Sequence, residues 1–519
     1  MTGSPGGPDA AAVCLDVGSY WTKAVLVQPD GTPAGFAEHP TTPDVLEGVD
    51  AAVAAAAASV GRHAGGPAPE VLACSSAGGP LRLAVVGAER LTATEAAHRV
   101  CRSAGARVVG VHTGPLAEDG IRELTGQQPG VVLLLGGADG DDPEVLLHNA
   151  GRLAGVRGRW PVLLAVPDAA RDDALELLRS GGRTVTACPN VTPRPGELVP
   201  GPAREAVAEI YARHALGGPG DSGRFGVMAR TRTPVAVAGG AAVLARATGA
   251  GVLVVDVGSA TTDVHSAVPP GAPRPGGVRP DAARSDGARS EDGATVMTVE
   301  GDLGVRDAAG SVLVEAQTEG LVDPVEADLL APAVGALEAA SRGAAPAVPA
   351  DRGAAAEDRR LAAIAAVVAL RRHLRHTGRI EEAAPGGMPG WIAPGDPHDP
   401  GAGPTGPAGE PGNAGAAAGG SARVAGARPV PEAGGGVPGP RRGGDIGLVV
   451  LTGGVFRQRD PAGLAAVAET VRRDPVLLAA LAQVDVRVDS ESVLAPAGLL
   501  AAHGREEAAR ALLAERLPR

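Results

Sequence analysis

The tetrapeptide Asp-Val-Gly-Ser occurs twice in this chain, beginning at Asp16 and at Asp256. Each copy ends a run of aliphatic residues, VCLDVGS at 13–19 and VLVVDVGS at 252–259. Such runs predict buried β-strands, and a glycine directly after a strand permits a tight turn into the next strand. The chain is therefore constrained to form two similar strand-turn-strand corners.

The first corner, DVGSYWTK, contains groups that can bind an anion. Gly18 lets the backbone turn tightly, so that the amides of the turn and the hydroxyls of Ser19 and Thr22 can point at a phosphate. Lys23 adds a positive charge. Taken alone, the corner is equally well an ordinary turn, since Asp, Gly and Ser are common turn formers.

The second corner, DVGSATTD, offers the same arrangement of turn amides and hydroxyl groups. Two such corners facing each other can hold the β- and γ-phosphates of a nucleotide from both sides. The presence of both copies favours this interpretation over two unrelated turns. The phosphate-binding candidates at the second corner are Gly258, Ser259, Thr261 and Thr262.

The carboxylates of Asp16 and Asp256 end their strands at these corners, and they are our candidates for binding Mg²⁺ through water. Hydrolysis of a nucleotide needs a carboxylate that positions a water molecule and a positive group that neutralises developing charge. Asp16 and Asp256 are therefore also the catalytic candidates, and Lys23 is the candidate for the positive charge. The pattern does not decide which aspartate acts as the base.

A third glycine corner, LVVLTGGVF, follows an aliphatic strand near the C-terminus. Gly453 and Gly454 would permit the close approach of a flat group such as adenine or ribose. A simple strand-to-helix turn explains this segment equally well when it is read alone.

Length and composition indicate an α/β protein with more than one domain. The 519 residues are too many for one ordinary core, and aromatic residues make up only 2% of the chain, so aliphatic strands must supply the core. Alternating strands and helices at about 95–216 predict an inserted α/β unit. We expect domains at 13–250 and 251–519, a disordered N-terminus at 1–12, and disordered low-complexity insertions at 268–293 and 384–444.

The charge and the cysteines restrict the class of function. The formal charge of −12 and the lack of a dense Lys/Arg stripe argue against a nucleic-acid binder. The four cysteines form no Cys-x-x-Cys pair, which predicts buried reduced thiols rather than a metal site or disulfides. The first residues do not resemble a signal peptide, and LAAIAAVVAL at 361–370 is too short to span a bilayer. We therefore expect a cytoplasmic protein without a membrane segment.

The three corners, in this order, resemble the phosphate-one, phosphate-two and adenosine motifs of the superfamily that contains actin, heat-shock chaperone ATPases and sugar kinases. More specifically, the chain resembles the MutL-type accessory proteins of adenosylcobalamin-dependent glutamate mutase. The resemblance covers 13–266, 295–310 and 445–500. It rests on six ordered blocks: DVGSYWTKAVLV, LLLGGADGDDPEVLLHNA, VMARTRTPVAVAGG, VVDVGSATTDVHS, TVEGDLGVR and LTGGVFR.

This resemblance implies an α/β fold with two actin-like ATPase domains around a nucleotide cleft. It also implies ATP and Mg²⁺ as cofactors, mutase subunits as partners, and a role in reactivating the mutase. Two positions depart from the family pattern: Tyr20 stands where a small hydroxyl residue is usual, and Ser259 where a second glycine is usual. A small-molecule kinase of the same fold and a non-enzymatic actin-like scaffold are the alternatives.

Three further features have no assigned role in this scheme. The block GGADGDDPEVLLHNA at 136–150 is either a second ligand or cation loop or an acidic start to a helix. In EGDLGVR, Glu300 and Asp302 flank Gly301 without an evident purpose. His265 is either a group that assists chemistry or a polar residue within a strand, and the second reading is the simpler one.

Overall fold

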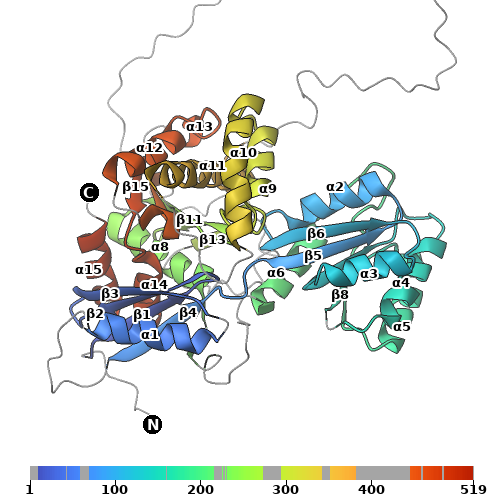
Figure 1. Ribbon diagram of the computed structural model, residues 1–519, viewed down its shortest axis with the longest axis horizontal. Coiled ribbons are helices and arrows are strands. Elements are labelled where there is room, and N and C mark those ends of the chain that lie inside the picture. The colour runs from blue at the N-terminus through green and yellow to red at the C-terminus, as the bar shows by residue number, and fades with distance from the viewer. Residues whose placement is uncertain are drawn as a thin grey trace, which may run out of the picture. The chain divides into compact units, whose positions relative to one another are not determined.

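The computed structural model contains three five-stranded sheets with helices packed on them (Figure 1). The residues that it describes are 10–42, 44–58, 69–158, 160–214, 225, 228–229, 231–272, 294–341, 351–380, 445–457, 460–481 and 484–517. The predicted insertion at 384–444, most of the one at 268–293, and residues 1–9 lie outside this range. Ala12, which we had placed in a disordered N-terminus, is the first residue of a strand.

The first sheet contains the first Asp-Val-Gly-Ser corner. The order of the strands in the sheet is β10-β4-β1-β2-β3. The central strand, β1, pairs antiparallel with β2 and parallel with β4. Helix α1 (Val45–Ala58) packs against β1 to β3 through the face that contains Val45, Val49 and Ala52. The strands are β1 (Ala12–Val17), β2 (Trp21–Val27), β3 (Pro33–Pro40), β4 (Glu70–Ser75) and β10 (Thr231–Arg232).

The second sheet repeats this topology around the second corner. Its order is β13-β12-β11-β14-β15, again with one antiparallel hairpin, a third antiparallel strand, and two parallel strands on the other side. The matching topologies confirm the predicted fold class of two similar α/β domains around a cleft. The strands are β11 (Gly251–Val257), β12 (Thr262–Val268), β13 (Ala294–Glu300), β14 (Ile446–Thr452) and β15 (Asp485–Asp489).

The third sheet is the inserted α/β unit, and all its strands are parallel in the order β6-β5-β7-β8-β9. Buried residues of α2 and α6 cover one face, and buried residues of α3, α4 and α5 cover the other. The unit starts with β5, a strand before residue 95 that our prediction lacked. Its strands are β5 (Leu81–Gly87), β6 (Ala106–Thr113), β7 (Val131–Leu135), β8 (Val162–Ala165) and β9 (Val185–Cys188). Its helices are α2 (Arg90–Cys101), α3 (Glu118–Gly126), α4 (Glu144–Gly155), α5 (Asp168–Ser180) and α6 (Gly201–His214).

The remaining helices lie around the two corner-bearing sheets. They are α8 (Thr233–Thr248), α9 (Ala309–Thr318), α10 (Pro324–Ser341), α11 (Arg352–His376), the 3₁₀ turn η2 (Gly454–Arg457), α12 (Pro461–Arg472), α13 (Leu478–Leu481), α14 (Leu494–Ala502) and α15 (Glu506–Arg516). The apolar run LAAIAAVVAL forms the middle of α11 and is buried on all sides, as expected for a helix without a polar face. No helix in the described part of the chain is long and apolar enough to cross a membrane.

The two corner-bearing sheets share one hydrophobic core. Residues of β1, β2 and β4 from the first sheet and of β11 and β14 from the second meet in a single buried cluster together with α8 and α14. The helices approach closely because glycines line their contact. A Cβ atom on Gly498 would lie 1.8 Å from the carbonyl oxygen of Ala236, and one on Gly240 would lie 2.1 Å from that of Leu494. The predicted domain boundary at 250/251 falls between α8 and β11 and stays a prediction.

The four cysteines are buried and unpaired, as expected for structural thiols. Burial raises the pKa of Cys14 to about 12 and that of Cys188 to about 11, so these thiols stay protonated at neutral pH.

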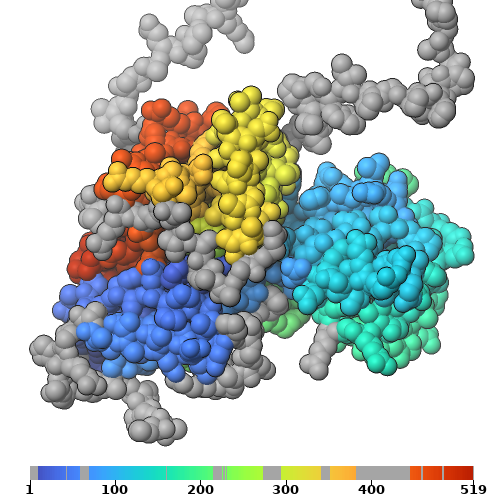
Figure 2. Space-filling view, viewed as in Figure 1, coloured from blue at the N-terminus to red at the C-terminus, as the bar shows by residue number. Residues whose placement is uncertain are grey.

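Replacing Gly498 by alanine tests the helix contact. Because the new methyl group overlaps the backbone of α8, we expect a loss of stability of about 2 kcal/mol or more and a clear fall in the thermal unfolding midpoint. Gly335→Ala is the matched control: it lies on the exposed side of α10, which forms part of the surface in Figure 2, and its added Cβ meets no atom within 4 Å. Alanine is the better helix former by about 0.5–1 kcal/mol, so this control should be neutral or stabilising. Equal midpoints for the two variants in a thermal melt would contradict the inferred contact.

Candidate functional site

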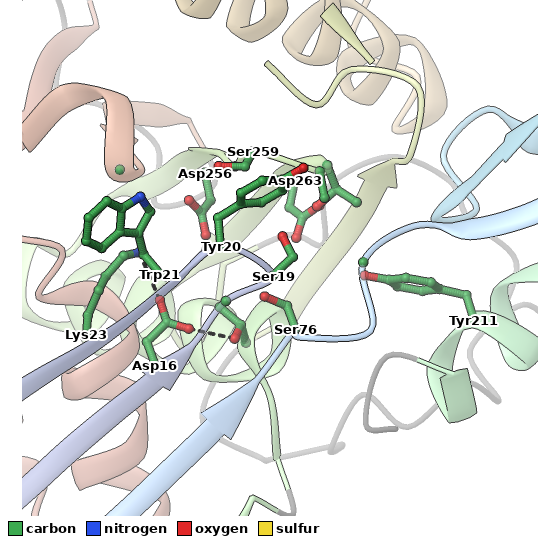
Figure 3. Close-up of a pocket in the computed structure, with 17 residues that line it drawn as sticks. Asp16, Ser19, Tyr20, Trp21, Lys23, Ser76, Tyr211, Asp256, Ser259 and Asp263 are labelled. Carbon is green, nitrogen blue, oxygen red and sulfur yellow. Dashed lines mark hydrogen bonds and ion pairs between the residues drawn. The ribbon is translucent and has the colours of Figure 1, made fainter. Parts of the chain in front are cut away.

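The two corners meet at one pocket, as shown in Figure 3. The first sheet supplies the strand end and turn of its corner, and the second sheet supplies the equivalent groups from the opposite side. The first residue of η2 also reaches the pocket. Of the predicted site residues, the pocket is lined by Asp16, Gly18, Ser19, Lys23, Asp256, Gly258, Ser259, Thr261 and Gly454.

The two corners have the same local geometry. In the first, the amide of Gly18 donates to the carbonyl of Trp21 at 3.0 Å; in the second, the amide of Gly258 donates to Thr261 at 2.8 Å. A Cβ atom on Gly18 would lie 2.9 Å from the Trp21 oxygen, and one on Gly258 would lie 2.8 Å from the Thr261 oxygen. Glycine is therefore required for each turn to close. The repeated sequence thus produces a repeated structure.

The first corner carries a lysine near its turn, because Lys23 is the cross-strand partner of Asp16. The Lys23 Nζ atom lies 3.0 Å from Oδ2 of Asp16, and the hydroxyl of Thr233 donates to Oδ1 of Asp16 at 2.7 Å. Burial opposes the charge of Lys23, but the carboxylates of Asp16 and Asp256 outweigh it and raise the lysine pKa. Lys23 is therefore a fixed cation at the edge of the pocket.

At the second corner the corresponding cross-strand pair is Asp256 and Asp263, two carboxylates. Burial, with Asp16 and Asp489 adding repulsion against the attraction of Lys23, raises the pKa of Asp256 to about 6. Burial and the charge of Asp256 raise the pKa of Asp263 well above its usual range. The buried Oδ1 atom of Asp263 has no hydrogen-bond partner among the described residues. Two carboxyl groups whose ionised forms lack a compensating partner fit a bound cation.

Magnesium suits this arrangement better than a fully protein-liganded metal does. In the described part of the chain, no group of three or more His, Cys, Asp or Glu side chains is arranged to hold a metal ion. Mg²⁺ keeps several waters and binds through one or two carboxylates plus phosphate oxygens. Asp256 and Asp263 offer that number of carboxylates.

Three predicted residues do not line the pocket. The hydroxyl of Thr22 lies 3.0 Å from that of Thr41, and the hydroxyl of Thr262 donates to the carbonyl of Leu303 at 2.7 Å. Both threonines are fully buried, because alternate side chains of a strand point to opposite faces. Their hydroxyls brace the corners and do not line the pocket. Gly453 contacts the backbone instead, since a Cβ there would lie 2.2 Å from the carbonyl oxygen of Val257.

The other residues that line the pocket were not among the predicted site residues. They are Tyr20, Trp21, Ser76, Gly79, Tyr211, Thr233, Ala260 and Asp263. A signal for Asp263 was present, because it stands at the same spacing from Asp256 as Lys23 does from Asp16. Tyr211 reaches the pocket from α6 of the inserted unit, a contact that no local pattern indicates.

The segment EGDLGVR, without a role in the sequence analysis, supports the second corner. The amides of Val305 and Arg306 donate to the carbonyls of Gly258 and Ser259 at 3.2 and 2.9 Å. Arg306 is itself held by Asp358 of α11 through a buried two-pronged ion pair with distances of 2.5 and 2.7 Å. The segment therefore fixes the turn against the core of the second half.

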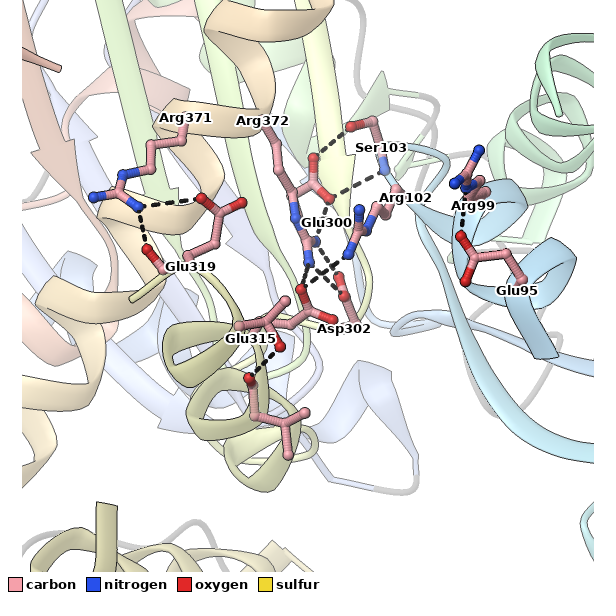
Figure 4. Close-up of polar contacts among 12 residues, drawn as sticks. Glu95, Arg99, Arg102, Ser103, Glu300, Asp302, Glu315, Glu319, Arg371 and Arg372 are labelled. Atoms are coloured by element: carbon pink, nitrogen blue, oxygen red, sulfur yellow. Dashed lines mark hydrogen bonds and ion pairs between the residues drawn. The ribbon is translucent and has the colours of Figure 1, made fainter. Parts of the chain in front are cut away.

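The same segment also attaches the inserted unit to the second sheet (Figure 4). The backbone amide and hydroxyl of Ser103, just after α2, donate to the carboxylate of Glu300 at 3.1 and 2.6 Å. Arg372 of α11 binds Glu300, Asp302 and Glu315 at 2.8 Å each, and it is almost fully buried. A buried arginine needs such partners, so the cluster stabilises this junction only while it is complete.

The acidic block at 136–142 has a structural explanation. Oδ2 of Asp141 accepts from the amide of Ala138 at 2.7 Å, and Oδ1 of Asp142 accepts from the amide of Glu144 at the start of α4 at 3.0 Å. His148 is a residue of α4 and lies 3.3 Å from the carbonyl of Leu116. The structure therefore supports the interpretation of this block as an acidic helix start.

His265 lies within β12 and does not line the pocket. Its ring is fully buried, and neither nitrogen has a hydrogen-bond partner among the described residues. Burial lowers its pKa to about 3, so the ring is neutral at physiological pH. The structure supports the simpler reading of His265 as a strand residue.

Comparison with known proteins gives a family match and weaker structural likenesses. The family described as MutL protein matches residues 12–517. Protein MutL from Clostridium tetanomorphum is 34% identical over 250 residues, which are 46% of this chain and 52% of that protein. The chain thus spans about half the length of the curated relative that it matches.

Two solved structures resemble the chain at 11–12% identity. The PilM–PilN type IV pilus biogenesis complex matches over 97% of this chain and 99% of the other, with a TM-score of 0.25. Xylulose kinase from Bifidobacterium adolescentis matches over 63% and 70%, with a TM-score of 0.19. TM-scores this low do not establish a shared fold.

The raised pKa of Asp256 leads to a stability prediction. Because Asp256 holds its proton up to a higher pH in the folded state than in the unfolded state, its contribution to stability falls as pH rises from about 4 to about 6. Asp256→Asn removes this penalty, so we expect the variant to be more stable at pH 7.5 by on the order of 1–3 kcal/mol, and to equal the parent near pH 3.5. Chemical denaturation at both pH values measures the difference. Asp328→Asn on the exposed side of α10 is the control, and a destabilised Asp256→Asn protein at pH 7.5 would refute the prediction.

Proposed function

Since the chain belongs to the MutL protein family, we propose that it is an ATP-binding accessory protein that reactivates an adenosylcobalamin-dependent carbon-skeleton mutase such as glutamate mutase. The proposal includes ATP hydrolysis, Mg²⁺ as the metal, the mutase subunits as partners, and the cytoplasm as the location. The pocket between the two corners is the observation that carries it.

The charges of the pocket support nucleotide phosphates with a metal. The hydroxyls of Ser19 and Ser259 offer donors from two sides, and Lys23 offers a positive charge. Asp256 and Asp263 would hold hydrated Mg²⁺ on the opposite wall. When bound, ATP supplies the phosphoryl group and the metal offsets its charge.

The hydrogen bonds of the two aspartates support different roles for them. Asp16 is engaged on both oxygens, by Lys23 and by Thr233, so its role is to position the lysine. Asp256 lines the pocket beside Ser259, where the phosphates would lie. We therefore assign the positioning of the attacking water to Asp256.

The shared core supports a coupling between the pocket and the rest of the molecule. A nucleotide that contacts both corners changes the separation of the two sheets, and the α8–α14 contact is the point about which that change occurs. Movement of the second corner is passed to the inserted unit through Glu300 and Ser103. In this proposal the inserted unit moves when nucleotide is bound or released.

The test combines purified protein with inactivated glutamate mutase, ATP, Mg²⁺ and fresh adenosylcobalamin. We expect mutase activity to recover with the parent and with the exposed-site control Asp328→Asn. Asp256→Asn should lower ATP hydrolysis and recovery at least about 100-fold, because the water and the metal lose a carboxylate. Mutase activity and phosphate release are measured in the same mixture.

Absence of recovery with the parent would overturn the proposed partner. The other candidate functions give different results in the same experiment. A kinase would turn over ATP strongly only when a small-molecule substrate is added, and a scaffold that assembles would scatter light on addition of ATP.

A further inference from the structure

Tyr20 connects the two corners across the pocket. It stands at the tip of the first turn, and its hydroxyl donates to Oδ1 of Asp307. Asp307 belongs to the second half: its amide donates to the carbonyl of Ser259 at 3.1 Å, and its own carbonyl accepts from Arg107 of β6. One tyrosine side chain therefore links the first corner to the second corner and, through Asp307, to the inserted unit.

The ring of Tyr20 takes up space that a triphosphate would need. In Figure 3 it lies among Ser19, Ser259, Asp256 and Asp263, the groups assigned above to the phosphates and the metal. The remaining cavity is about 70 Å³. Small-molecule sites are usually about 300–1,000 Å³, so a nucleotide cannot enter this arrangement without displacing something.

We propose that Tyr20 and Asp307 form a self-inhibitory latch that holds the two corners together and closes the pocket to nucleotide phosphates. The proposal rests on the nucleotide site proposed above. The bond from the phenol to a carboxylate is charge-assisted, and it is partly buried, which places it among the stronger side-chain hydrogen bonds. Nucleotide binding requires the latch to open, so the measured affinity equals the affinity of the open form multiplied by the fraction of molecules in which the latch is open.

Tyr20→Phe keeps the ring and removes the bond, and Tyr20→Ser removes both. Asp307→Asn removes the charge from the other partner. Each change raises the fraction of molecules in which the latch is open. We therefore expect Mg²⁺–ATP and Mg²⁺–ADP to bind about 10-fold more tightly to Tyr20→Phe and to Asp307→Asn than to the parent. Binding to Tyr20→Ser should be tighter still. Association should be faster in each case. Isothermal titration and stopped-flow fluorescence with a labelled nucleotide measure these quantities, with Asp328→Asn as the matched control for the loss of a carboxylate.

Hydrogen exchange without nucleotide provides an independent readout of the latch. In Tyr20→Phe, the amides of Gly18, Val305 and Asp307, which are hydrogen-bonded in the structure, should exchange faster than in the parent. Asp328→Asn should leave these amides unchanged.

The outcomes separate the latch from the proposed function. Weaker or unchanged nucleotide binding in Tyr20→Phe, with a parent that binds, would show that Tyr20 assists binding or is neutral, and would overturn the latch alone. Unchanged exchange in Tyr20→Phe would overturn it whatever the nucleotide result. If exchange is faster in Tyr20→Phe but neither the parent nor any variant binds nucleotide, the latch between the corners would stand and the proposed nucleotide site would be overturned.

Discussion

The contact between α8 and α14 is the constraint on which the rest of the structure depends. Three glycines, at 239, 240 and 498, allow the two helix backbones to touch, and strands from both corner-bearing sheets pack against this pair in one core. Without that contact, the repeated corners would be two separate hairpins. With it, the ends of β1 and β11 face each other across a single pocket. The chemistry of the pocket thus depends on small residues that do not line it.

Buried charge connects the third sheet to this arrangement. The inserted unit belongs to the first half of the chain, yet Ser103 binds Glu300 at the end of β13, and Tyr211 reaches the pocket from α6. Arg372 holds the carboxylates at this junction together. Because a buried arginine tolerates the loss of a partner poorly, the junction has few alternative arrangements. These contacts therefore hold the inserted unit firmly against the end of β13.

The sequence predicted the local features of the site and not its long-range contacts. Aliphatic runs followed by Gly18 and Gly258 were sufficient to place both corners, because glycine and strand pattern act over a few residues. Thr22 and Thr262 lie in strands, and their neighbours on either side line the pocket, so strand alternation turns the two threonines away from it. The strand LRLAVVG was missed, although its pattern is aliphatic. The bond between Tyr20 and Asp307 joins residues 287 positions apart, and no local pattern contains that information.

The duplicated hairpins differ by one reversal of charge at the same register position, Lys23 in one and Asp263 in the other. Two identical hairpins would give a symmetric site that accepts a ligand in either direction. This exchange places an ammonium group on one wall, paired with Asp16, and a second carboxyl group on the other. A ligand with its anionic groups on one side and a cation on the other then has one favourable orientation, and this difference between the walls arises at a single register position of the repeat.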